Sequence, residues 1–493
     1  MDLEMSIELK NEIQLFLDEE IQQIHSASLE ILANPGMRID SSLLRAALKS
    51  AGAQVDDTNR VVRFPATLVE TTLEQIQAAL RLGKKQIVLN GVVASLSSRS
   101  MCTKFGGACI EYMDWKTGQV RTPTYSDLLH MVQLGEALPE VTFVGNPVVY
   151  LSEDDGTAID PRMQRIMTAA LIARHTTKAG STEVWNAAEL KYLMELGQIV
   201  RGSPEEYVAR PCFVTAKETI SPLILDEAAG DVLLLLAQNN LPCVVIPMPI
   251  TGTSSPLSLA TNIALANAEI LGTFTAIHAA FPGANLVGGV ISSTFDMKSA
   301  LPIFASPEAV LQDIGLAEVH KRLYGFDCGV GGYIDAKYPG PQSMLEVSGR
   351  FSALARSGRY NVPVGLLNAG RRFSAIQALM GIEAERWIVE AGKGIEVSPD
   401  TLLVDQVRRV GIGGHSLGER HTVDNMRTAI WYPHLMDHSI SAAGQEQVKD
   451  MMSTAARRVE MILESQDLYE AEPAQTRAID EVVRAAEKEL LKA

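Results

Sequence analysis

Between about residue 140 and residue 400, short apolar runs alternate with longer segments whose hydrophobic positions recur at helical spacing. Such runs predict buried β-strands, and the longer segments predict helices that bury one face. We expect eight strands, at 141–150, 180–185, 211–216, 242–248, 285–292, 326–334, 362–367 and 394–397. Helices are expected between them, at 187–201, 222–239, 256–280, 307–323, 340–357 and 374–392. Eight strands that alternate with helices over about 255 residues are typical of a (β/α)8 TIM barrel, an α/β fold.

The segment 242–272 shows this pattern clearly. A β-branched run at 244–246 ends in a loop of Pro, Gly, Thr and Ser residues, and helical spacing then continues up to Leu271. Ser255 and Pro256 suit the N-cap and the first residue of that helix. Because an apolar run at 285–292 follows, the segment predicts a strand–helix–strand unit. Loops after such strands are where α/β folds place their chemistry.

An open, doubly wound sheet is the competing arrangement. Its best-known signature is a glycine-rich turn of the pattern GxGxxG after the first strand. No such turn follows the expected strand at 141–150. The barrel is therefore the favoured architecture.

Further elements are expected at both ends of the chain. The pattern predicts helices at 6–33, 41–52 and 66–80, and a β-rich stretch at 86–120. We interpret residues 1–135 as an N-terminal α+β elaboration packed on the barrel, 136–400 as the barrel, and 401–493 as a C-terminal loop and helices. The charged helix expected at 473–492 is a packing or oligomer element, and we expect a homo-oligomer.

Composition excludes several classes of partner. The 493 residues carry 43 Lys and Arg against 59 Asp and Glu, a formal net charge of −16, so we expect neither nucleic acid nor a membrane surface as partner. No stretch approaches the ~18 apolar residues of a membrane span. The first residues lack the basic start and apolar core of a signal peptide. Five cysteines, an odd number without CxxC spacing, favour a reduced, cytoplasmic protein.

Metal and phosphate sites have no local motif in this sequence. The histidines lack HExxH or HxH spacing, and no glycine-rich segment precedes Lys-Ser or Lys-Thr as in a P-loop. A zinc site assembled from Cys212, Cys243 and Cys328 is an alternative, but buried cysteines that act as small hydrophobes explain these residues better. We therefore expect no metal ion and no tightly bound cofactor.

Aromatic, acidic and basic side chains occur near the expected strand ends. The aromatic and acidic ones are Tyr150, Glu183, Trp185, Glu218, Tyr333, Asp335 and Phe373. Trp185 and Tyr333 suit a cage for a quaternary ammonium, because aromatic faces attract cations. Arg371 suits a substrate carboxylate, and the loop 251–256 precedes a helix N-terminus, which favours anions. Packing, solvation and helix capping are the alternative explanations. The glycine-rich run 328–332 indicates room for a large group.

Several motifs occur in order along nearly the whole chain. They are Ile24-His-Ser-Ala-Ser-Leu-Glu-Ile-Leu, Asp114-Trp-Lys-Thr-Gly, Met248-Pro-Ile-Thr-Gly-Thr-Ser-Ser-Pro-Leu-Ser-Leu-Ala, Asp296-Met-Lys, Asp335-Ala-Lys and Gly413-Gly-His-Ser-Leu-Gly-Glu-Arg-His-Thr. By their order and spacing, the chain resembles the trimethylamine methyltransferase (MttB-like) superfamily of corrinoid-dependent methyltransferases.

The resemblance implies a TIM barrel that binds a methylated amine and presents it to the cobalt(I) of a separate corrinoid protein. The trimethylamine enzymes of this family carry pyrrolysine near the end of strand six, whereas the corresponding stretch here, Gly331-Gly332-Tyr333-Ile334, holds only standard residues. Members without pyrrolysine resemble methyltransferases for quaternary amines. We therefore expect demethylation of a quaternary amine, with glycine betaine favoured and dimethylglycine as its product. Proline betaine, carnitine and other betaines are alternatives.

A quaternary ammonium needs no acid or metal to activate it, because loss of a methyl cation leaves a neutral tertiary amine. The cobalt of the partner is then the nucleophile, and the side chains of this protein bind and orient the substrate without being catalytic. We expect Trp185 and Tyr333 at the trimethylammonium end and Glu183 and Asp335 as compensating negative charges. The candidates for the carboxylate end are His421, Arg371 and the amides of Thr253, Ser254 and Ser255.

Two other classes of function remain open on the sequence alone. One is a metal-dependent TIM-barrel lyase or hydrolase, which a metal ion at the strand ends would support. The other is a betaine-binding relative that has lost catalysis. It would bind a betaine without transferring a methyl group.

Overall fold

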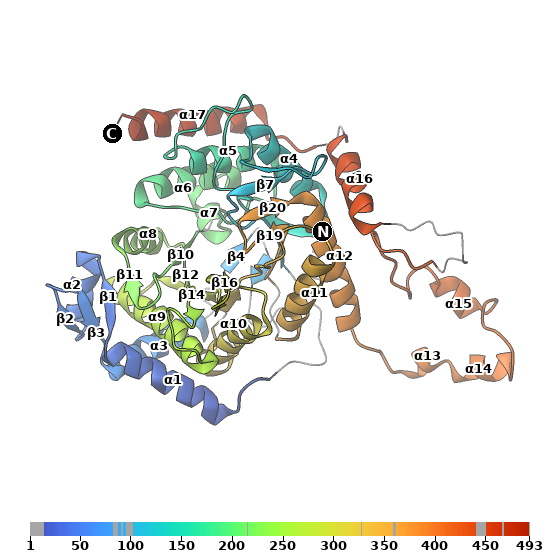
Figure 1. The fold of residues 1–493 in the computed structure, drawn as a ribbon, viewed down its shortest axis with the longest axis horizontal. Coiled ribbons are helices and arrows are strands. Elements are labelled where there is room, and N and C mark those ends of the chain that lie inside the picture. The colour runs from blue at the N-terminus through green and yellow to red at the C-terminus, as the bar shows by residue number, and fades with distance from the viewer. Residues whose placement is uncertain are drawn as a thin grey trace.

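The computed structural model describes residues 14–81, 87–89, 92–94, 102–213, 215–326, 328–357, 361–439, 450–465 and 468–492. These residues form a mixed α/β protein in which helices surround short sheets (Figure 1). The helices are α1 (Asp18–Ala33), α2 (Ser42–Ser50), α3 (Ala66–Arg81), α4 (Tyr125–Ala137), α5 (Gln164–His175), α6 (Ala187–Arg201), α7 (Pro204–Ala209), α8 (Glu227–Gln238), α9 (Leu259–Ala280), α10 (Pro307–Val319), the π-helix η1 (His320–Tyr324), α11 (Pro341–Arg356), α12 (Ala375–Gly392), α13 (Pro399–Leu402), α14 (Val404–Val410), α15 (Arg420–Asn425), α16 (Met451–Leu463) and α17 (Pro473–Leu490).

The strands are short, and the structure places them in several small sheets. They are β1 (Met37–Ile39), β2 (Gln54–Asp56), β3 (Val61–Arg63), β4 (Ile87–Leu89), β5 (Val92–Ala94), β6 (Cys102–Phe105), β7 (Glu111–Met113), β8 (Val120–Arg121), β9 (Val141–Val144), β10 (Ala216–Glu218), β11 (Ile224–Leu225), β12 (Pro242–Ile246), β13 (Ile250–Thr251), β14 (Asn285–Val290), β15 (Ser293–Asp296), β16 (Leu301–Ile303), β17 (Cys328–Val330), β18 (Asn361–Val364), β19 (Leu366–Leu367) and β20 (Arg372–Ser374).

A parallel sheet of order β10-β12-β14-β17 forms one part of the interior. Its register places Glu218 beside Ile246, and Gly288 beside Cys328. The helices α8, α9 and α10 connect successive strands and pack on them, as crossover helices between parallel strands do. This sheet carries the alternation of strands and helices that the sequence pattern predicts.

A second parallel sheet has the order β18-β6-β9. Beyond β9 the ladder continues irregularly, because the amide of Gly180 donates to the carbonyl of Val144 (2.8 Å) and the amide of Phe213 donates to the carbonyl of Gly180 (2.5 Å). Phe213 lies three residues before β10, so this irregular ladder leads from the second sheet toward the first. The strand β6 belongs to the expected N-terminal elaboration, yet it pairs with two strands of the expected barrel range.

The expected strands differ in how well the structure bears them out. Strands lie within 141–150, 242–248, 285–292 and 326–334, and β18 and β19 cover the run at 362–367. Residues 180–185 form backbone hydrogen bonds but no regular strand, and β10 starts at the last residue of 211–216. The strand expected at 394–397 is wrong, because these residues are irregular and exposed. Among the described residues the ladders form separate sheets rather than one closed ring.

The helix α9 is buried over most of its length. Its buried carboxylate at Glu269 accepts hydrogen bonds from the hydroxyls of Thr219 and Ser221 and from the amide of Leu223 (2.8 Å). By length and composition α9 is the one helix of the described chain that qualifies as a membrane span, with a mean hydropathy of 1.3, although the sequence suggested no such stretch. Because 89% of that window is buried inside the protein, its apolar character is that of a core helix.

The N-terminal helices cover one side of α9. The helices expected at 41–52 and 66–80 are confirmed as α2 and α3, and both pack against α9 together with α1. The helix expected at 6–33 is confirmed from Asp18 onward and wrong at residues 14–17, which are irregular; residues 6–13 lie outside the described residues. The strand β1 pairs in parallel with β11, which ties this N-terminal region to the segment before α8.

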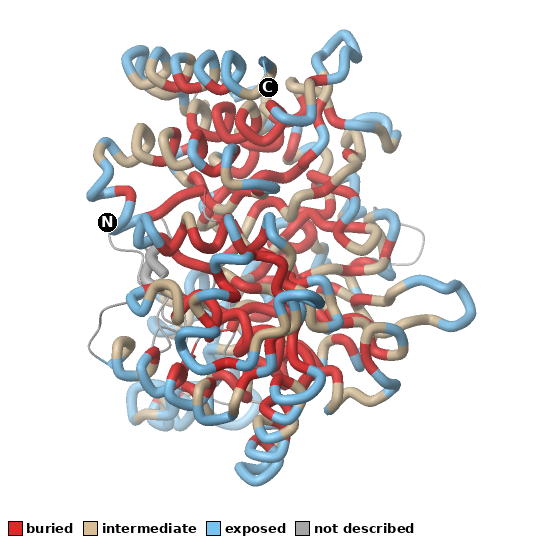
Figure 2. The backbone as a smooth tube through the Cα atoms, turned by 90° about the vertical axis from the view of Figure 1, so that its left-hand side faces the viewer, coloured by how far each residue is buried: buried red, intermediate tan, exposed pale blue. Residues whose placement is uncertain are grey.

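The C-terminal helix α17 lies along α5 and α6 (Figure 1). Ile479, Val482 and Ala486 are buried in that contact, and the hydroxyl of Tyr192 donates to Glu489 (2.7 Å). The charged tail is thus a packing element of its own chain. Buried backbone fills the interior, while exposed positions gather on the outer helices and loops (Figure 2).

Candidate active site

Four charged side chains converge inside the protein. We define Lys104, Glu183, Lys217 and Glu218 as the interior charge cluster. Lys104 lies on β6, and Lys217 and Glu218 end β10. Glu183 lies in the irregular segment that follows β9 in the ladder and precedes α6, so residues far apart in sequence meet here.

Lys217 holds the cluster together. Its side chain is buried, and its Nζ donates to the carbonyl of Val184 (2.7 Å). The same Nζ lies 3.8 Å from Glu183 Oε1 and 3.8 Å from Glu218 Oε2. One ammonium therefore stands between two carboxylates, which offsets part of their mutual repulsion.

The electrostatic environment of Glu183 is unusual for a carboxylate. The pKa of Glu183 is raised to about 7, first by burial and then by the neighbouring carboxylate of Glu218, against the opposing effect of Lys217, Lys104 and Arg165. A carboxylate whose pKa lies near neutrality responds to any added positive charge by ionising more completely. Strongly perturbed groups of this kind concentrate at functional sites.

Lys104 is a second enclosed cation of the cluster. Burial lowers the pKa of Lys104, and the charges of Glu183 and Glu218 oppose that shift. Among the described residues, its Nζ has no hydrogen-bond partner in the structure, unlike that of Lys217. A Cβ at Gly145 would lie 2.7 Å from the carbonyl oxygen of Ser181 and 3.6 Å from Lys104 Cε, so glycine at position 145 leaves space beside this side chain.

Tyr333 lies next to the cluster. Burial raises the pKa of its hydroxyl, and the nearby groups of Cys109, Glu218 and Glu183 add to that effect. The ring packs edge-to-face on Phe304, with centroids 5.5 Å apart. Gly370 adopts φ +76°, and a Cβ there would lie 2.8 Å from Tyr333 Cε1, so the tyrosine ring packs directly on the backbone.

Trp185 lies two residues beyond Glu183 but has a different environment. Its side chain is 41% exposed, and the guanidinium of Arg165 stacks on its ring at 3.8 Å. Arg165 also forms a buried, two-bonded ion pair with Glu189 (2.7 Å for both bonds). One face of the indole is therefore already occupied by a cation of the protein. Tyr150 approaches the same ring edge-to-face at 6.5 Å.

Asp335 is occupied by backbone hydrogen bonds. Its carboxylate accepts from the amides of Phe304 (3.0 Å) and Ala305 (2.7 Å). Burial raises the pKa of Asp335, and those amides oppose the shift. Its own amide donates to Glu346 (2.9 Å). In this arrangement Asp335 fixes the loop that precedes α10.

The amides of Thr253, Ser254 and Ser255 all donate to the carbonyl of Ile250, at 3.1, 3.1 and 3.3 Å. They close a tight turn, and the structure therefore does not leave them pointing at a ligand. Because residues 253–255 belong to this turn, α9 begins later than expected, at Leu259 with Ser258 as its N-cap. The expected N-cap at Ser255 is wrong, since this residue belongs to the turn and its hydroxyl contacts Asn262 (2.5 Å).

The remaining expected carboxylate ligands, Arg371 and His421, are exposed. Arg371 is exposed, and its carbonyl accepts from the amides of Ile110 and Glu111 (2.9 Å each). His421 is exposed on α15, in a segment that extends away from the body of the protein (Figure 1). Of the expected site residues, the structure brings together Glu183 and Tyr333.

The cysteines considered as zinc ligands are buried and separate from one another. Their sulfur atoms each lie near a backbone carbonyl: Cys212 near Gly197, Cys243 near Leu233 and Cys328 near Gly329. Burial raises the pKa of Cys212 to about 11 and also raises that of Cys328. Within the described part of the chain, no group of three or more His, Cys, Asp or Glu side chains is arranged to hold a metal ion.

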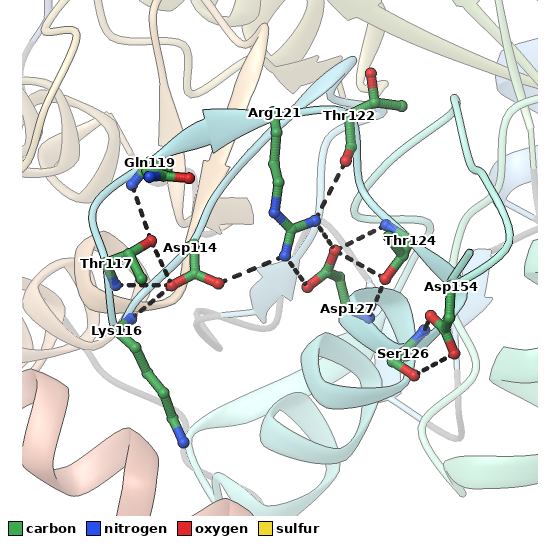
Figure 3. Close-up of polar contacts among 10 residues, drawn as sticks. All are labelled: Asp114, Lys116, Thr117, Gln119, Arg121, Thr122, Thr124, Ser126, Asp127 and Asp154. Atoms are coloured by element: carbon green, nitrogen blue, oxygen red, sulfur yellow. Dashed lines mark hydrogen bonds and ion pairs between the residues drawn. The ribbon is translucent and has the colours of Figure 1, made fainter. Parts of the chain in front are cut away.

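The Asp114-Trp-Lys-Thr-Gly motif forms the hairpin between β7 and β8 (Figure 3). Asp114 accepts from the amides of Lys116 (3.0 Å) and Thr117 (2.8 Å), which shapes the turn. Arg121 pairs with Asp127 (2.8 Å) and reaches Asp114 (3.4 Å). The polar residues of this motif therefore have a structural role within the hairpin.

A family model described as trimethylamine methyltransferase (MTTB) matches residues 4–490. The chain belongs to this family. The chain is 29% identical over 469 residues to a trimethylamine methyltransferase of Desulfitobacterium hafniense, an alignment that covers 93% of this chain and 90% of the relative. It is 23% identical to a glycine betaine methyltransferase of the same species, with 91% and 92% coverage.

Comparison with solved structures gives low structural similarity. The Methanosarcina barkeri monomethylamine methyltransferase MtmB shares 14% sequence identity with this chain, with a TM-score of 0.44 and coverage of 96% of this chain and 94% of that one. A structure of the MtmB complex with hydroxylamine has a TM-score of 0.47 at the same identity.

Sequence reasoning missed Lys104 and Lys217. Neither belongs to a motif of fixed spacing, and an isolated lysine is usually a solvated surface residue. One signal was available: Lys104 lies between the buried residues Thr103 and Phe105 of β6, and Lys217 lies two residues from each of the buried residues Thr215 and Thr219. Charged side chains inside such runs are rarely buried without a paired charge or a ligand.

Proposed function

We propose that this protein transfers a methyl group from a quaternary amine to the cobalt(I) of a cognate corrinoid protein, with glycine betaine as the favoured substrate and dimethylglycine as the product. The observation that carries the proposal is the interior charge cluster with Tyr333 beside it. Family membership and the similarity to a glycine betaine methyltransferase support the reaction class.

The charge balance of the cluster favours a zwitterionic substrate. Two carboxylates and two ammonium groups sum to zero when all four are charged. A substrate that carries only a cation brings an uncompensated charge into an enclosed site, which costs free energy. A betaine brings one charge of each sign. It therefore enters a balanced cluster without unbalancing it.

We assign the two ends of a betaine to opposite parts of this cluster. The trimethylammonium lies toward Glu183, Glu218 and the ring of Tyr333, where carboxylate charge and cation–π attraction act together. The carboxylate lies toward Lys104, whose ammonium has no hydrogen-bond partner among the described residues. Trp185, with one face stacked by Arg165, contributes its remaining surface at the ammonium end.

The remaining expected ligands take smaller roles in this proposal. Asp335 contributes negative charge without direct contact with the substrate, because its carboxylate oxygens accept hydrogen bonds from the amides of Phe304 and Ala305. Lys104 replaces Arg371, His421 and the amides of residues 253–255 as the carboxylate ligand.

The chemical step needs little from the protein beyond position and charge. The bond between nitrogen and one methyl carbon breaks, the electron pair stays on nitrogen, and the methyl acceptor supplies the pair that forms the new bond. The protein holds the substrate in line and excludes water. As the ammonium becomes a neutral amine, the site loses a positive charge. Glu183, with its pKa of about 7, restores the balance by taking up a proton.

We infer that the two parallel sheets are parts of a (β/α)8 barrel in which β6 takes the place expected for residues 394–397. Hydrogen bonds from Val144 through Gly180 to Phe213 support this interpretation, because they link the second sheet toward the first. A Cβ at Gly332 would lie 2.2 Å from Pro363, so the segment after β17 lies against β18 on the other side. We also infer a cytoplasmic enzyme, in keeping with its acidic composition and with five cysteines that lack CxxC spacing.

Methyl transfer to free cobalamin tests the proposal. The purified protein is mixed with cob(I)alamin and glycine betaine, proline betaine or carnitine, and formation of methylcobalamin is followed by its absorbance spectrum. We expect transfer from at least one betaine and the fastest transfer from glycine betaine. Betaine binding without transfer to cobalamin or to a corrinoid protein would instead identify a non-catalytic relative. Activity that depends on an added divalent metal and converts no methylated amine would favour a lyase or hydrolase.

A further inference from the structure

A long segment between α12 and α16 stands away from the rest of the protein (Figure 1). We call residues 395–432 the arm. It contains α13, α14 and α15, and it returns to the body where the carboxylate of Glu383 on α12 accepts the amides of His434 (2.8 Å) and Leu435 (2.9 Å). The helix α16 then packs on α12, so both ends of the arm are tied to the same helix.

The arm carries an unusual concentration of exposed apolar side chains. Within 395–432 only Gln406 is buried. Eleven of the 26 exposed large hydrophobic residues in the described chain fall in this segment, and each is at least 50% exposed. They are Ile395, Val397, Leu402, Val404, Val407, Ile412, Leu417, Val423, Met426, Ile430 and Tyr432. So many exposed apolar side chains along one segment point to a surface that another molecule covers.

The charges of the arm are nearly balanced and largely satisfied within it. Four arginines face five carboxylates between residues 395 and 432. Three ion pairs lie inside the arm, between Arg408 and Asp405 (2.6 Å), Arg409 and Glu419 (3.0 Å), and Arg420 and Asp424 (3.3 Å). The arm is thus an apolar, almost neutral element on a protein with a net charge of −16.

We propose that the arm is the interface with a second copy of this chain. Homodimer interfaces are built around a two-fold axis, so the same surface serves both partners. Two copies of an acidic protein repel each other over most of their surface. Their contact must therefore lie where the charge is balanced and the surface is apolar, and the arm meets both conditions.

The size of the apolar surface also fits a permanent contact. An aliphatic side chain presents roughly 100 Å² of apolar surface, so eleven that are at least half exposed present on the order of 600 Å². A standard protein interface takes roughly 800 Å² from each partner, and permanent homodimers take roughly 1,000 Å² or more. The arm's apolar residues therefore supply a large part of such an interface, and polar atoms of the arm and neighbouring surface supply the rest.

A second copy explains the arm better than a carrier protein does. A protein that delivers the methyl acceptor must bind and leave in each reaction cycle, and transient interfaces are no more apolar than the ordinary protein surface. Permanent homodimer interfaces are more apolar and exclude charge. The arm also has almost no buried residue of its own, so a permanent partner is what offsets the entropy cost of ordering it.

The test is the mass of the full-length protein in solution, measured by sedimentation velocity and light scattering. We expect the wild type at a multiple of the 53.4 kDa chain mass. The double variant Val407→Asp with Ile412→Asp puts two charges on the arm and is expected to sediment at 53.4 kDa, with an unchanged far-ultraviolet circular dichroism spectrum. Leu345→Asp is the matched control, because Leu345 is 76% exposed on α11, outside the arm, and its change is expected to leave the assembly intact.

Hydrogen exchange supplies a second readout. Amides of residues 395–432 are expected to exchange more slowly in the assembled wild type than in the dissociated double variant, while α9 keeps its protection in both. A wild type that is monomeric at every concentration overturns the proposal. A double variant that stays assembled also overturns the proposal. If that assembled variant loses methyl transfer to the corrinoid protein, the arm contacts the corrinoid protein instead of a second copy.

Discussion

Replacing Glu183 by Gln is expected to stabilise the protein at neutral and alkaline pH. The folded protein raises the pKa of this carboxyl from 4.5 to about 7, so the folded state holds the proton more tightly than the unfolded state does. The stability of the wild type therefore falls as pH rises from about 4.5 to about 7, and the full penalty persists above that window. A difference of this size in pKa corresponds to on the order of 3 kcal/mol.

Gln has nearly the shape of Glu but never ionises, so the Glu183→Gln variant escapes this penalty. Urea unfolding at about pH 8 should give a free energy of unfolding higher than that of the wild type by up to on the order of 3 kcal/mol. At about pH 5 the gain should shrink to less than about 1 kcal/mol, because the wild-type carboxyl is then largely protonated when folded. The same variant should bind glycine betaine more weakly, since it lacks the carboxylate that faces the ammonium.

Glu189→Gln is the matched control, because Glu189 lies six residues further along the chain, in the first turn of α6. Glu189 forms the buried ion pair with Arg165 (2.7 Å), so the change leaves a buried guanidinium without its partner. We expect a loss of about 3–5 kcal/mol of stability, opposite in sign to the effect at Glu183. Equal stability of wild type and Glu183→Gln at about pH 8, or a gain that does not vary with pH, would refute the electrostatic argument.

Three further substitutions test the site and its support. Lys104→Met should raise KM for glycine betaine in steady-state kinetics by roughly 10- to 100-fold, the range expected for loss of a charge-assisted hydrogen bond. Calorimetry should show that the variant binds tetramethylammonium, which lacks a carboxylate, no more weakly than the wild type does. Tyr333→Ala should raise KM for glycine betaine by roughly 3- to 30-fold, because cation–π attraction is lost. Tyr333→Phe keeps the aromatic ring and should keep a KM near that of the wild type. Unchanged kinetics in the alanine variant would remove Tyr333 from the site. Arg350→Met should lower the free energy of unfolding by about 3–5 kcal/mol, since it leaves Asp313 as an unpaired buried carboxylate, and a loss below about 1 kcal/mol in urea unfolding would contradict this.

Strong hydrophobic periodicity explains which parts of the fold could be predicted from the sequence. The helices expected at 187–201, 307–323 and 374–392 appear as α6, α10 with η1, and α12, because each has a long apolar face and a capping residue at its start. Short apolar runs are less specific. Residues 394–397 have the composition of a strand, yet they begin the arm, and nothing local distinguishes the two outcomes.

The strand β6 shows the opposite problem. It lies within a β-rich stretch that the pattern places in a separate N-terminal elaboration, but it pairs with β9 and β18, whose residues are about 40 and 260 positions away. Pairings over such separations depend on the arrangement of the whole chain and leave no local trace in the sequence. The domain boundary expected after residue 135 therefore divides the second sheet.

The site was predictable where side-chain chemistry was distinctive and unpredictable where it depended on backbone geometry. Glu183 and Tyr333 could be identified as an acidic and an aromatic residue near strand ends. The amides of residues 253–255 were expected to bind an anion, but the turn directs all three to the carbonyl of Ile250. Lys104 joins the cluster only because β6 pairs where it does. A sequence pattern does not reveal that position.

The central claim is that this protein removes a methyl group from a quaternary amine. The direct measurement is a single-turnover reaction with cob(I)alamin, run in parallel with glycine betaine and with trimethylamine, in which methylcobalamin is quantified by absorbance and the amine product by mass spectrometry. The account predicts methylcobalamin and dimethylglycine in equal amounts from glycine betaine, and no methylcobalamin above background from trimethylamine. Methylation from trimethylamine, or from no quaternary amine at all, would contradict it.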